Sequence, residues 1–202
     1  MQPIGALLFS FAALAAAAPA ENSRRAVGND NSKPFQVYAY GTGVGGLSMF
    51  SAGGSDAYFG DHTKFNDSNA APVIFTPTDD NVWLGAPNTT ALNTTSPPTW
   101  SNLTFSVPGT GSSEHNVGFL DSNSTSSDRQ SSGFTFYGTF IFVESSTGGM
   151  ESLWYATPSS IDGIYSLKWN ETGDSTDEKI VLTLKKSPPS NASKSKSKSR
   201  SD

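Results

Sequence analysis

Two acidic side chains, Glu144 and Glu151, have the spacing that best fits a chemical reaction. They flank the segment 145–150, whose Gly-Gly pair favours a turn, so in a hairpin the two carboxylates could face each other. Carboxylates on either side of a bound sugar hydrolyse a glycosidic bond as a general acid paired with a nucleophile or base. Asp56 and Asp61 form a second, looser pair. Because a chain with 18 acidic residues contains such pairs by chance, we expect no catalytic residue and keep Glu144 and Glu151 for the alternative, a polysaccharide hydrolase.

Metal and cofactor chemistry find little support in the residue types. The chain has no cysteine, and its two histidines, His62 and His115, have no partner at a spacing typical of zinc ligands. Each histidine follows an acidic residue, but neighbours in a strand point to opposite faces, so surface turns explain Asp61-His62 and Glu114-His115 better. We expect no metal and no cofactor. A Ser-His-acid triad assembled from distant residues stays open.

Two short strings match ligand-binding motifs but lack their structural context. Residues 41–46 read Gly-Thr-Gly-Val-Gly-Gly, which fits the glycine pattern of dinucleotide-binding loops. Such a loop needs a helix at its third glycine to bind the pyrophosphate, whereas residues 47–54 alternate and then turn. The acidic run 79–81 lacks the spaced ligands of a calcium loop. We interpret the first string as a bend between strands and the second as a turn.

The chain also contains sequence signals for secretion and N-glycosylation. Residues 1–20 form an apolar leader with small residues at its end, which predicts a signal peptide cut after Ala18 or Ala20. Residues 21–32 form a polar linker, in which Arg24-Arg25 is a candidate end of a pro-segment. Because sequons are modified in the secretory pathway, the sequence predicts a secreted, extracellular glycoprotein. The seven Asn-x-Ser/Thr sequons begin at Asn66, Asn88, Asn93, Asn102, Asn123, Asn170 and Asn191.

Charge divides the chain after the leader into two parts. Residues 21–184 hold 7 Lys and Arg against 17 Asp and Glu, a net charge of −10, whereas residues 185–202 hold 6 against 1, a net +5. An acidic body disfavours nucleic acid and anionic membranes as partners, because both attract positive charge. Residues 185–202 repeat serine and lysine without an apolar face, so we expect a disordered basic tail. No stretch after the leader is long and apolar enough to predict a membrane span.

Short apolar and aromatic runs separated by Gly, Pro, Asn, Asp and Ser predict one all-β domain over residues 33–184. Without disulfides, its stability must come from an ordinary hydrophobic core. The connections are too short for crossover helices, which favours an antiparallel β-sandwich, with a jelly roll as one version, over a closed barrel. The expected strands are 35–40, 46–51, 55–60, 72–76, 81–85, 102–107, 116–120, 133–143, 150–157, 163–169 and 179–184.

Alternation within these runs predicts how single strands are oriented. It is clearest over 133–143, where phenylalanines occupy one face, so we expect a long central strand with a phenylalanine-rich core side. The dipeptides Gly53-Gly54 and Asp162-Gly163 tolerate positive φ and predict two hairpins. Phe134, Phe136, Phe140 and Phe142 are the phenylalanines assigned to the core side.

Aromatic side chains provide the best binding hypothesis, because exposed rings on a β-sheet can stack on sugar rings. Most of them will lie in the core. Trp154 and Tyr155 are neighbours in an expected strand, so we expect one to be buried and the other exposed. The candidates are Trp83, Trp100, Trp154, Trp169, Tyr38, Tyr40, Tyr58, Tyr137, Tyr155 and Tyr165.

Four stretches carry a resemblance to known sequences: Gly-Gly-Leu-Ser-Met-Phe-Ser-Ala-Gly-Gly-Ser-Asp-Ala-Tyr-Phe-Gly-Asp (45–61), Ser-Glu-His-Asn-Val-Gly-Phe-Leu (113–120), Glu-Ser-Leu-Trp-Tyr-Ala-Thr-Pro (151–158) and Asp-Gly-Ile-Tyr-Ser-Leu-Lys-Trp-Asn (162–170). They resemble uncharacterised secreted proteins of filamentous ascomycete fungi. The resemblance covers roughly residues 35–184 and implies a fungal extracellular setting and one domain. It implies no activity and no site residues, since that family has no assigned activity.

Three functions are therefore compatible with the sequence. The favoured one is a non-catalytic protein that binds at the cell wall or extracellular matrix through exposed aromatics and polar loops, with cell-wall carbohydrate as the candidate ligand. The alternatives are the polysaccharide hydrolase with Glu144 and Glu151, and a secreted protein-interaction or effector protein with an extracellular protein as partner.

Overall fold

Antiparallel β-strands form almost all of the regular structure in the computed structural model, which describes residues 31–92, 96–121, 124 and 126–190. The elements are β1 (Tyr38–Gly41), β2 (Val44–Ser51), β3 (Tyr58–Phe59), η1 (His62–Lys64), β4 (Ala71–Pro77), β5 (Trp83–Pro87), η2 (Thr89–Ala91), β6 (Leu103–Pro108), β7 (Gly118–Leu120), β8 (Arg129–Gln130), β9 (Phe134–Tyr137), β10 (Phe140–Glu144), β11 (Met150–Glu151), β12 (Trp154–Pro158), β13 (Tyr165–Trp169), β14 (Ile180–Val181) and β15 (Thr183–Lys185). The predicted all-β class is confirmed. In this described part of the chain, no helix is long and apolar enough to cross a membrane.

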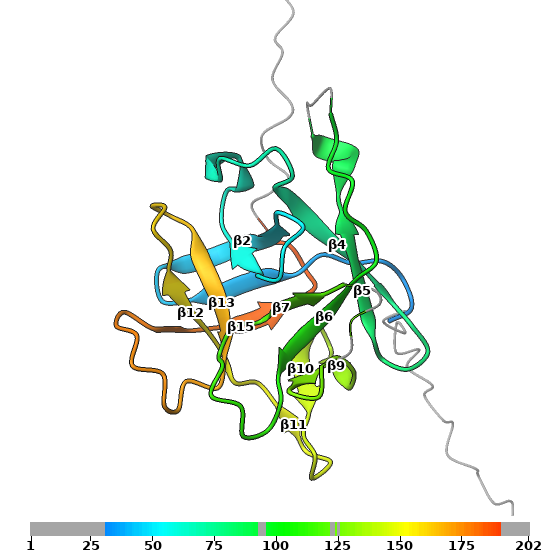
Figure 1. The fold of residues 1–202 in the computed structure, drawn as a ribbon, viewed down its shortest axis with the longest axis vertical. Helices are drawn as coiled ribbons and strands as arrows, with labels where there is room; N and C mark the ends of the chain where they lie inside the picture. The colour runs from blue at the N-terminus through cyan, green and yellow to red at the C-terminus, as the bar shows by residue number, and fades with distance from the viewer. Residues whose placement is uncertain (1–30, 93–95, 122–123, 125, 191–202) are drawn as a thin grey trace, which may run out of the picture.

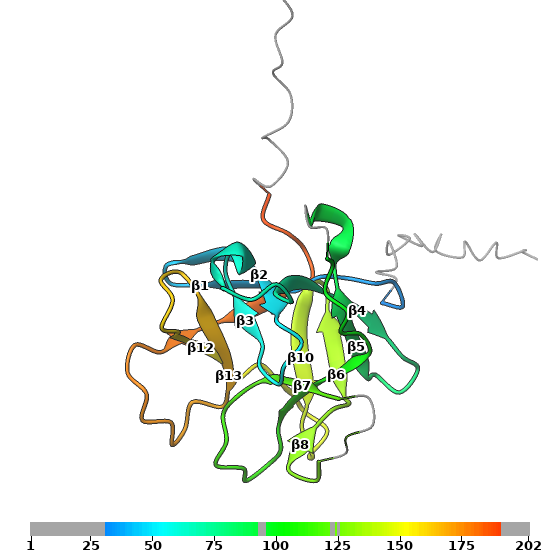
Figure 2. The ribbon, with the colours of Figure 1, turned by 45° about the horizontal axis from the view of Figure 1, so that its top comes forward.

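The strands form one hydrogen-bonded network that curls into a sandwich-like shape. Its main path is β11-β10-β15-β1-β2-β3-β13-β12-β14, with a branch from β2 through β4, β5 and β6 to β7 and β8, and with β9 on β10. Figure 2 shows β12 and β13 on one side of the molecule and β4 and β5 on the other. Only Leu182 separates β14 from β15 in the sequence. β14 nevertheless pairs with β12 and β15 pairs with β1, two strands that are far apart along this path. The sandwich-like architecture is confirmed, while a jelly-roll order stays a prediction.

Pairing between β1 and β15 brings the beginning and the end of the domain side by side (Figure 1). The Tyr40 hydroxyl donates to the Ser187 carbonyl at 3.2 Å, and the Lys186 amide donates to the Thr139 carbonyl at 2.9 Å. The folded domain therefore extends past the expected boundary at 184. The expected signal peptide, most of the linker and residues 191–202 of the basic tail lie outside the described residues.

Aromatic rings fill the centre of the hydrophobic core. Trp83 lies 5.1 Å from Phe134 and 6.1 Å from Phe105 between ring centroids, and Phe105 lies 5.2 Å from Phe75. The buried indole of Trp154 donates from Nε1 to the Ile141 carbonyl at 3.0 Å. Such contacts let a chain without disulfides form a stable core, because large rings bury much apolar surface and pack in preferred geometries.

The expected long strand over 133–143 is wrong, because the chain turns back within it. β9 and β10 form a hairpin in which Tyr137 pairs with Phe140, so the loop contains only Gly138 and Thr139. Gly138 has a φ of 64°, and a two-residue hairpin with positive φ at its first position is the geometry that glycine allows. The turn changes the alternation after it. Ile141 and Val143 enter the core, whereas Phe140 faces outward.

Other turns form where the glycines predicted them. Gly41 pairs with Val44 across the bend between β1 and β2, where Gly43 has a φ of 76°, so the dinucleotide-like string is a hairpin. Gly53 between β2 and β3 and Gly163 between β12 and β13 also have positive φ. Both strand pairs are antiparallel, which confirms the two predicted hairpins.

Candidate functional site

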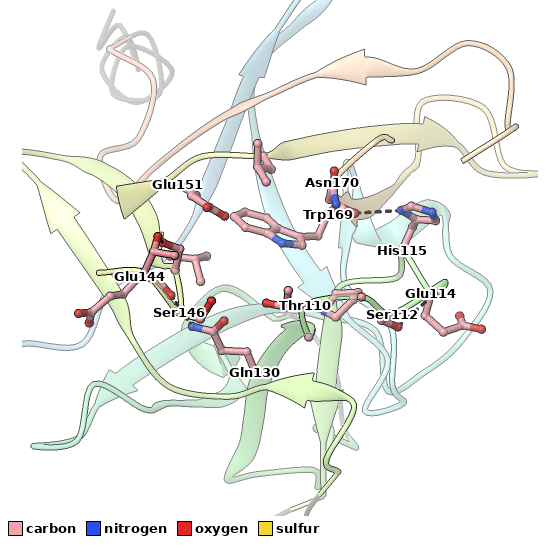
Figure 3. A pocket seen from close by; sticks show the side chains of 17 residues that line it. Thr110, Ser112, Glu114, His115, Gln130, Glu144, Ser146, Glu151, Trp169 and Asn170 are labelled. Carbon is pink, nitrogen blue, oxygen red and sulfur yellow. Dashed lines mark hydrogen bonds between the residues drawn. The ribbon is translucent and has the colours of Figure 1, made fainter. Parts of the chain in front are cut away.

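A polar hollow of ≈ 340 Å³ lies between the loop after β6, the β10–β11 hairpin and the end of β13 (Figure 3). Next to the lining residue Gln130, Arg129 donates from Nε to the Ser106 hydroxyl at 2.8 Å and from Nη2 to the Asn116 carbonyl at 3.0 Å. Trp169 contributes an aromatic wall, and hydroxyl, amide and carboxylate groups complete the lining. The hollow is therefore lined mainly by polar groups, with one tryptophan among them.

The two glutamates of the hydrolase hypothesis both border this hollow, but they do not face each other. In the β10–β11 hairpin, Glu151 pairs with Val143 and Glu144 pairs with Met150. Directly paired residues share a face, so Glu151 lies on the inner face with buried Val143, and Glu144 lies on the outer face. In Figure 3 the Glu151 carboxylate lies beside the Trp169 indole and the Glu144 carboxylate points away from it. This register gives the pair no common face on which to enclose a sugar.

The remaining acid and imidazole pairs have structural explanations. Asp61 caps η1, accepting hydrogen bonds from the Thr63 amide at 3.0 Å and its hydroxyl at 2.7 Å, and these bonds lower the pKa of Asp61. His62 lies within that same turn. His115 donates from Nδ1 to the Trp169 carbonyl at 3.1 Å, while the adjacent Glu114 is exposed. The predicted surface turn is therefore confirmed for Asp61-His62, whereas Glu114-His115 lies in an irregular segment that is not a turn, with His115 half-buried.

The acidic run after β4 is a turn, as expected. The Asn81 amide donates to the Thr78 carbonyl at 3.1 Å, and Asn81 has a φ of 55°, which asparagine tolerates. Among the described residues, no group of three or more His, Asp or Glu side chains is placed to hold a metal ion. Asp56, of the second loose acid pair, forms an isolated bridge with Gly118 and lies near the Tyr58 phenol, whose pKa is raised by burial and by Asp56.

Most of the tryptophans and one tyrosine belong to the interior. Trp83, Trp154 and Trp169 are buried, and Trp100 is half-buried against Gly53. The expectation that either Trp154 or Tyr155 would be exposed is wrong, because both are buried. Both faces of β12 are covered: Trp154 points into the core, and the hydroxyl of Tyr155 donates to an Asp174 carboxylate oxygen in the loop after β13.

Aromatic side chains instead gather on the outer face of four neighbouring strands. Tyr137 on β9 pairs with Phe140 on β10, Phe140 pairs with Lys185 on β15, and Lys185 pairs with Tyr38 on β1. Direct pairing places all four side chains on one face. Tyr40 lies on the same face two residues after Tyr38. We call these five residues the aromatic face. Tyr137 is 69% exposed and Phe140 is 40% exposed, whereas Tyr38 and Tyr40 are half-buried. Among the described residues, every other aromatic side chain is half-buried or buried.

A lysine organises the centre of the aromatic face. The Lys185 Nζ lies 4.8 Å from the ring centroid of Tyr40 and 4.7 Å from that of Phe140, within the range of cation–π attraction. The Tyr38 hydroxyl donates to Gln36 Oε1 at 3.3 Å, and burial, with Tyr40 as a second cause, raises the pKa of Tyr38. The rings are therefore held in place before any ligand arrives, and the phenol of Tyr38 stays protonated.

The aromatic candidates predicted from the sequence included Tyr38, Tyr40 and Tyr137 but not Phe140 or Lys185. It assigned Phe140 to the core side of a long strand and Lys185 to the tail. A glycine within the Tyr137–Phe140 aromatic run is the signal that marks the hairpin, because a two-residue turn needs positive φ. No comparable signal exists for Lys185, whose partners lie far away in the sequence.

The described sequon asparagines lie outside the strands that form the aromatic face. The strands β1, β9, β10 and β15 contain none. The side chains of Asn66, Asn102 and Asn170 are exposed, and Asn88 is half-buried, with Oδ1 accepting from the Thr90 hydroxyl at 2.6 Å. The other three predicted acceptors, Asn93, Asn123 and Asn191, lie outside the described residues.

Comparisons with known proteins place the chain in no family. No protein-family model matches it, no curated protein matches it, and no solved structure matches its fold. The resemblance to secreted ascomycete proteins therefore stays a prediction. The two surfaces, the hollow and the aromatic face, are the features from which function can be inferred.

Proposed function

We propose that this protein is a secreted, N-glycosylated and non-catalytic protein of an extracellular fungal setting, which binds cell-wall polysaccharide through its aromatic face. The observation that carries the proposal is the cross-strand row of Tyr137, Phe140, Lys185 and Tyr38, in which the rings of Tyr137 and Phe140 are exposed. Exposed apolar groups gathered in one patch are typical of interaction sites, whereas scattered ones are ordinary.

The shape of the aromatic face suits an extended, uncharged chain of sugars. Neighbouring strands lie ~4.8 Å apart, so the row across four strands spans roughly 14 Å. Sugar rings have apolar C–H faces that pack on aromatic rings, and their hydroxyl groups accept hydrogen bonds from a lysine ammonium. A polysaccharide that crosses the strands would place successive sugars over Tyr137, Phe140 and Tyr38, with Lys185 between them.

The arrangement of acids argues for binding rather than hydrolysis. Glu144 continues the outer face of β10, while Glu151 points into the hollow on the inner face. Hydrolysis requires two carboxyl groups that enclose the same glycosidic bond. A sugar on the aromatic face would meet only one of the two acids, so it would be held without being cut.

The test is a pull-down of the secreted protein on insoluble cell-wall polysaccharides, with bound protein and released soluble sugar scored together. We expect retention of the wild type without sugar release, and loss of retention in Tyr137→Ala/Phe140→Ala. Val181→Ala is the matched control, because Val181 is an exposed apolar residue (66%) outside the aromatic face. Sugar release that Glu144→Gln or Glu151→Gln abolishes would favour the hydrolase. Neither retention nor release would overturn both carbohydrate functions and favour a protein partner.

A further inference from the structure

The polar hollow beside Trp169 borders a predicted glycosylation site. Asn170 begins the sequon Asn-Glu-Thr and lines the hollow next to Trp169 (Figure 3). In a regular strand, residues 169 and 170 would point to opposite faces. Asn170, however, follows the last residue of β13 and has a φ of 54°, so the backbone leaves the extended conformation there and the alternation ends.

The backbone around Asn170 is held firmly. Its amide donates to the Leu153 carbonyl at 2.9 Å, and the Trp169 amide donates to the His115 carbonyl at 2.9 Å. The Trp169 ring packs at 4.5 Å, edge to face, on buried Trp154. A sugar attached at Asn170 would thus be joined to a rigid point directly beside a fixed indole, which lowers the entropy lost when the sugar packs against the protein.

We infer that the first N-acetylglucosamine of a glycan on Asn170 occupies the hollow and packs against Trp169. Trp169 is 7% exposed, so the sugar's apolar face would contact only the part of the indole that lines the hollow. Its hydroxyls and acetamide fit the polar wall that Thr110, Ser112, Gln130 and Glu151 help to form. The hollow, at ≈ 340 Å³, is lined by polar and apolar surface together, as such a ligand requires. The attached sugar acts here as a built-in part of the fold, and it closes the hollow to free substrates.

The inference rests on passage through the secretory pathway, which is part of the proposed function, and not on polysaccharide binding. Asn102 supplies a matched control. It is an exposed sequon asparagine with a φ of 55°, almost the same backbone conformation, but it does not line the hollow. A general effect of glycans on solubility or unfolding would appear equally at both positions, whereas packing against Trp169 is confined to Asn170.

The experiment uses the full chain secreted from a eukaryotic host. Glycopeptide mass spectrometry measures occupancy, and thermal unfolding compares Asn170→Gln with Asn102→Gln. We expect Asn170 to be occupied and its loss to lower Tm by roughly 2–5 °C for a domain of this size, with a change below about 1 °C for Asn102→Gln. Thr172→Ala, which keeps Asn170 and destroys the sequon, must reproduce the loss. An endoglycosidase that leaves one N-acetylglucosamine must preserve Tm, because only that first sugar contacts the hollow.

The possible failures are distinguishable. Secretion without glycans at any sequon would overturn both the glycoprotein proposal and this inference. Occupancy elsewhere with an empty Asn170 would overturn this inference alone. Equal Tm changes for Asn170→Gln and Asn102→Gln would also overturn it. So would an Asn170→Gln loss of the same size in unglycosylated bacterial protein, because the cause would then be the backbone at residue 170.

Discussion

Replacement of two phenylalanines in one hairpin tests the register that creates the aromatic face. Phe134 and Phe140 are six residues apart and would share a face in a continuous strand. In the hairpin they separate: Phe134 is 1% exposed, and Phe140 is 40% exposed. The same substitution, Phe to Ala, should therefore have very different costs at the two positions.

The magnitudes follow from the contacts of each ring. Phe134 packs at 5.1 Å on Trp83 and at 5.0 Å on Phe105, so its loss leaves a cavity in the core and should cost about 3–5 kcal/mol. Phe140 loses the contact with the Lys185 ammonium and part of its burial, which we put at about 1 kcal/mol. For a domain of this size, these values correspond to a fall in Tm of about 6–20 °C for Phe134→Ala and about 2–4 °C for Phe140→Ala.

Urea denaturation followed by tryptophan fluorescence is the assay. The free energy of unfolding should fall for Phe134→Ala with an unchanged m value, because the surface exposed on unfolding stays similar. Equal losses in the two variants would refute the reasoning, since they would mean that both phenylalanines share an environment and that the chain does not turn at Gly138. Because the expected loss for Phe140→Ala is small, this variant should stay folded and can be used in binding experiments.

Two further predictions concern backbone strain and pH. Gly138→Val should lower the free energy of unfolding in urea by about 1–2 kcal/mol, because a β-branched residue is strained at a φ of 64°. Gly45→Ala should change it little, because Gly45 has an ordinary φ and open space beside it. Equal effects of the two substitutions would contradict the turn geometry. Desolvation raises the pKa of Asp174, but hydrogen bonds from Thr176 and Tyr155 outweigh it and hold that pKa below its ordinary value. A carboxylate with a lowered pKa stabilises the fold above about pH 4, and this stabilisation is lost as the pH falls below that value. The Tm of the wild type should therefore exceed that of Asp174→Asn by less at pH 2 than at pH 5. A constant difference in Tm would contradict the hydrogen bonds assigned to Asp174.

Local patterns in the sequence predict the class of this fold well. Alternating apolar residues and glycine-containing turns locate most strands, and Gly53 and Gly163 mark the hairpins that form. These features depend on neighbouring residues, whose backbone preferences act without the rest of the fold. The turn at Gly138 could have been predicted in the same way, but phenylalanines recur at every second position on both sides of it, which is the alternation of one strand.

Features that depend on distant partners could not be predicted in the same way. Tyr155 is buried because the loop containing Asp174 covers the second face of β12. Lys185 belongs to the aromatic face because β15 pairs with β1 at one edge and with β10 at the other. Side-chain alternation assigns a residue to one of two faces, but it does not say which faces will be covered or which strands will be neighbours.

The separation of Glu144 from Glu151 illustrates the same limit in the candidate site. Their sequence spacing fits residues that face each other across a hairpin, but a shift of one register position sends them to opposite faces. Because of this register, the two glutamates lie on two different surfaces of the molecule. Glu144 lies on the outer face of β10, and Glu151 lies beside Trp169 in the hollow. Binding on the outer face and glycan packing in the hollow can therefore take place at the same time.

The most direct test of the central claim is a binding isotherm on whichever cell-wall polysaccharide retains the wild-type protein. Tyr137→Ala/Phe140→Ala removes the two open rings, each worth about 0.5–1.5 kcal/mol in stacking, so the account predicts a dissociation constant about 5–150 times that of the wild type. Val181→Ala should bind like the wild type. An unchanged dissociation constant for the folded double variant would contradict the claim that the aromatic face is the binding site.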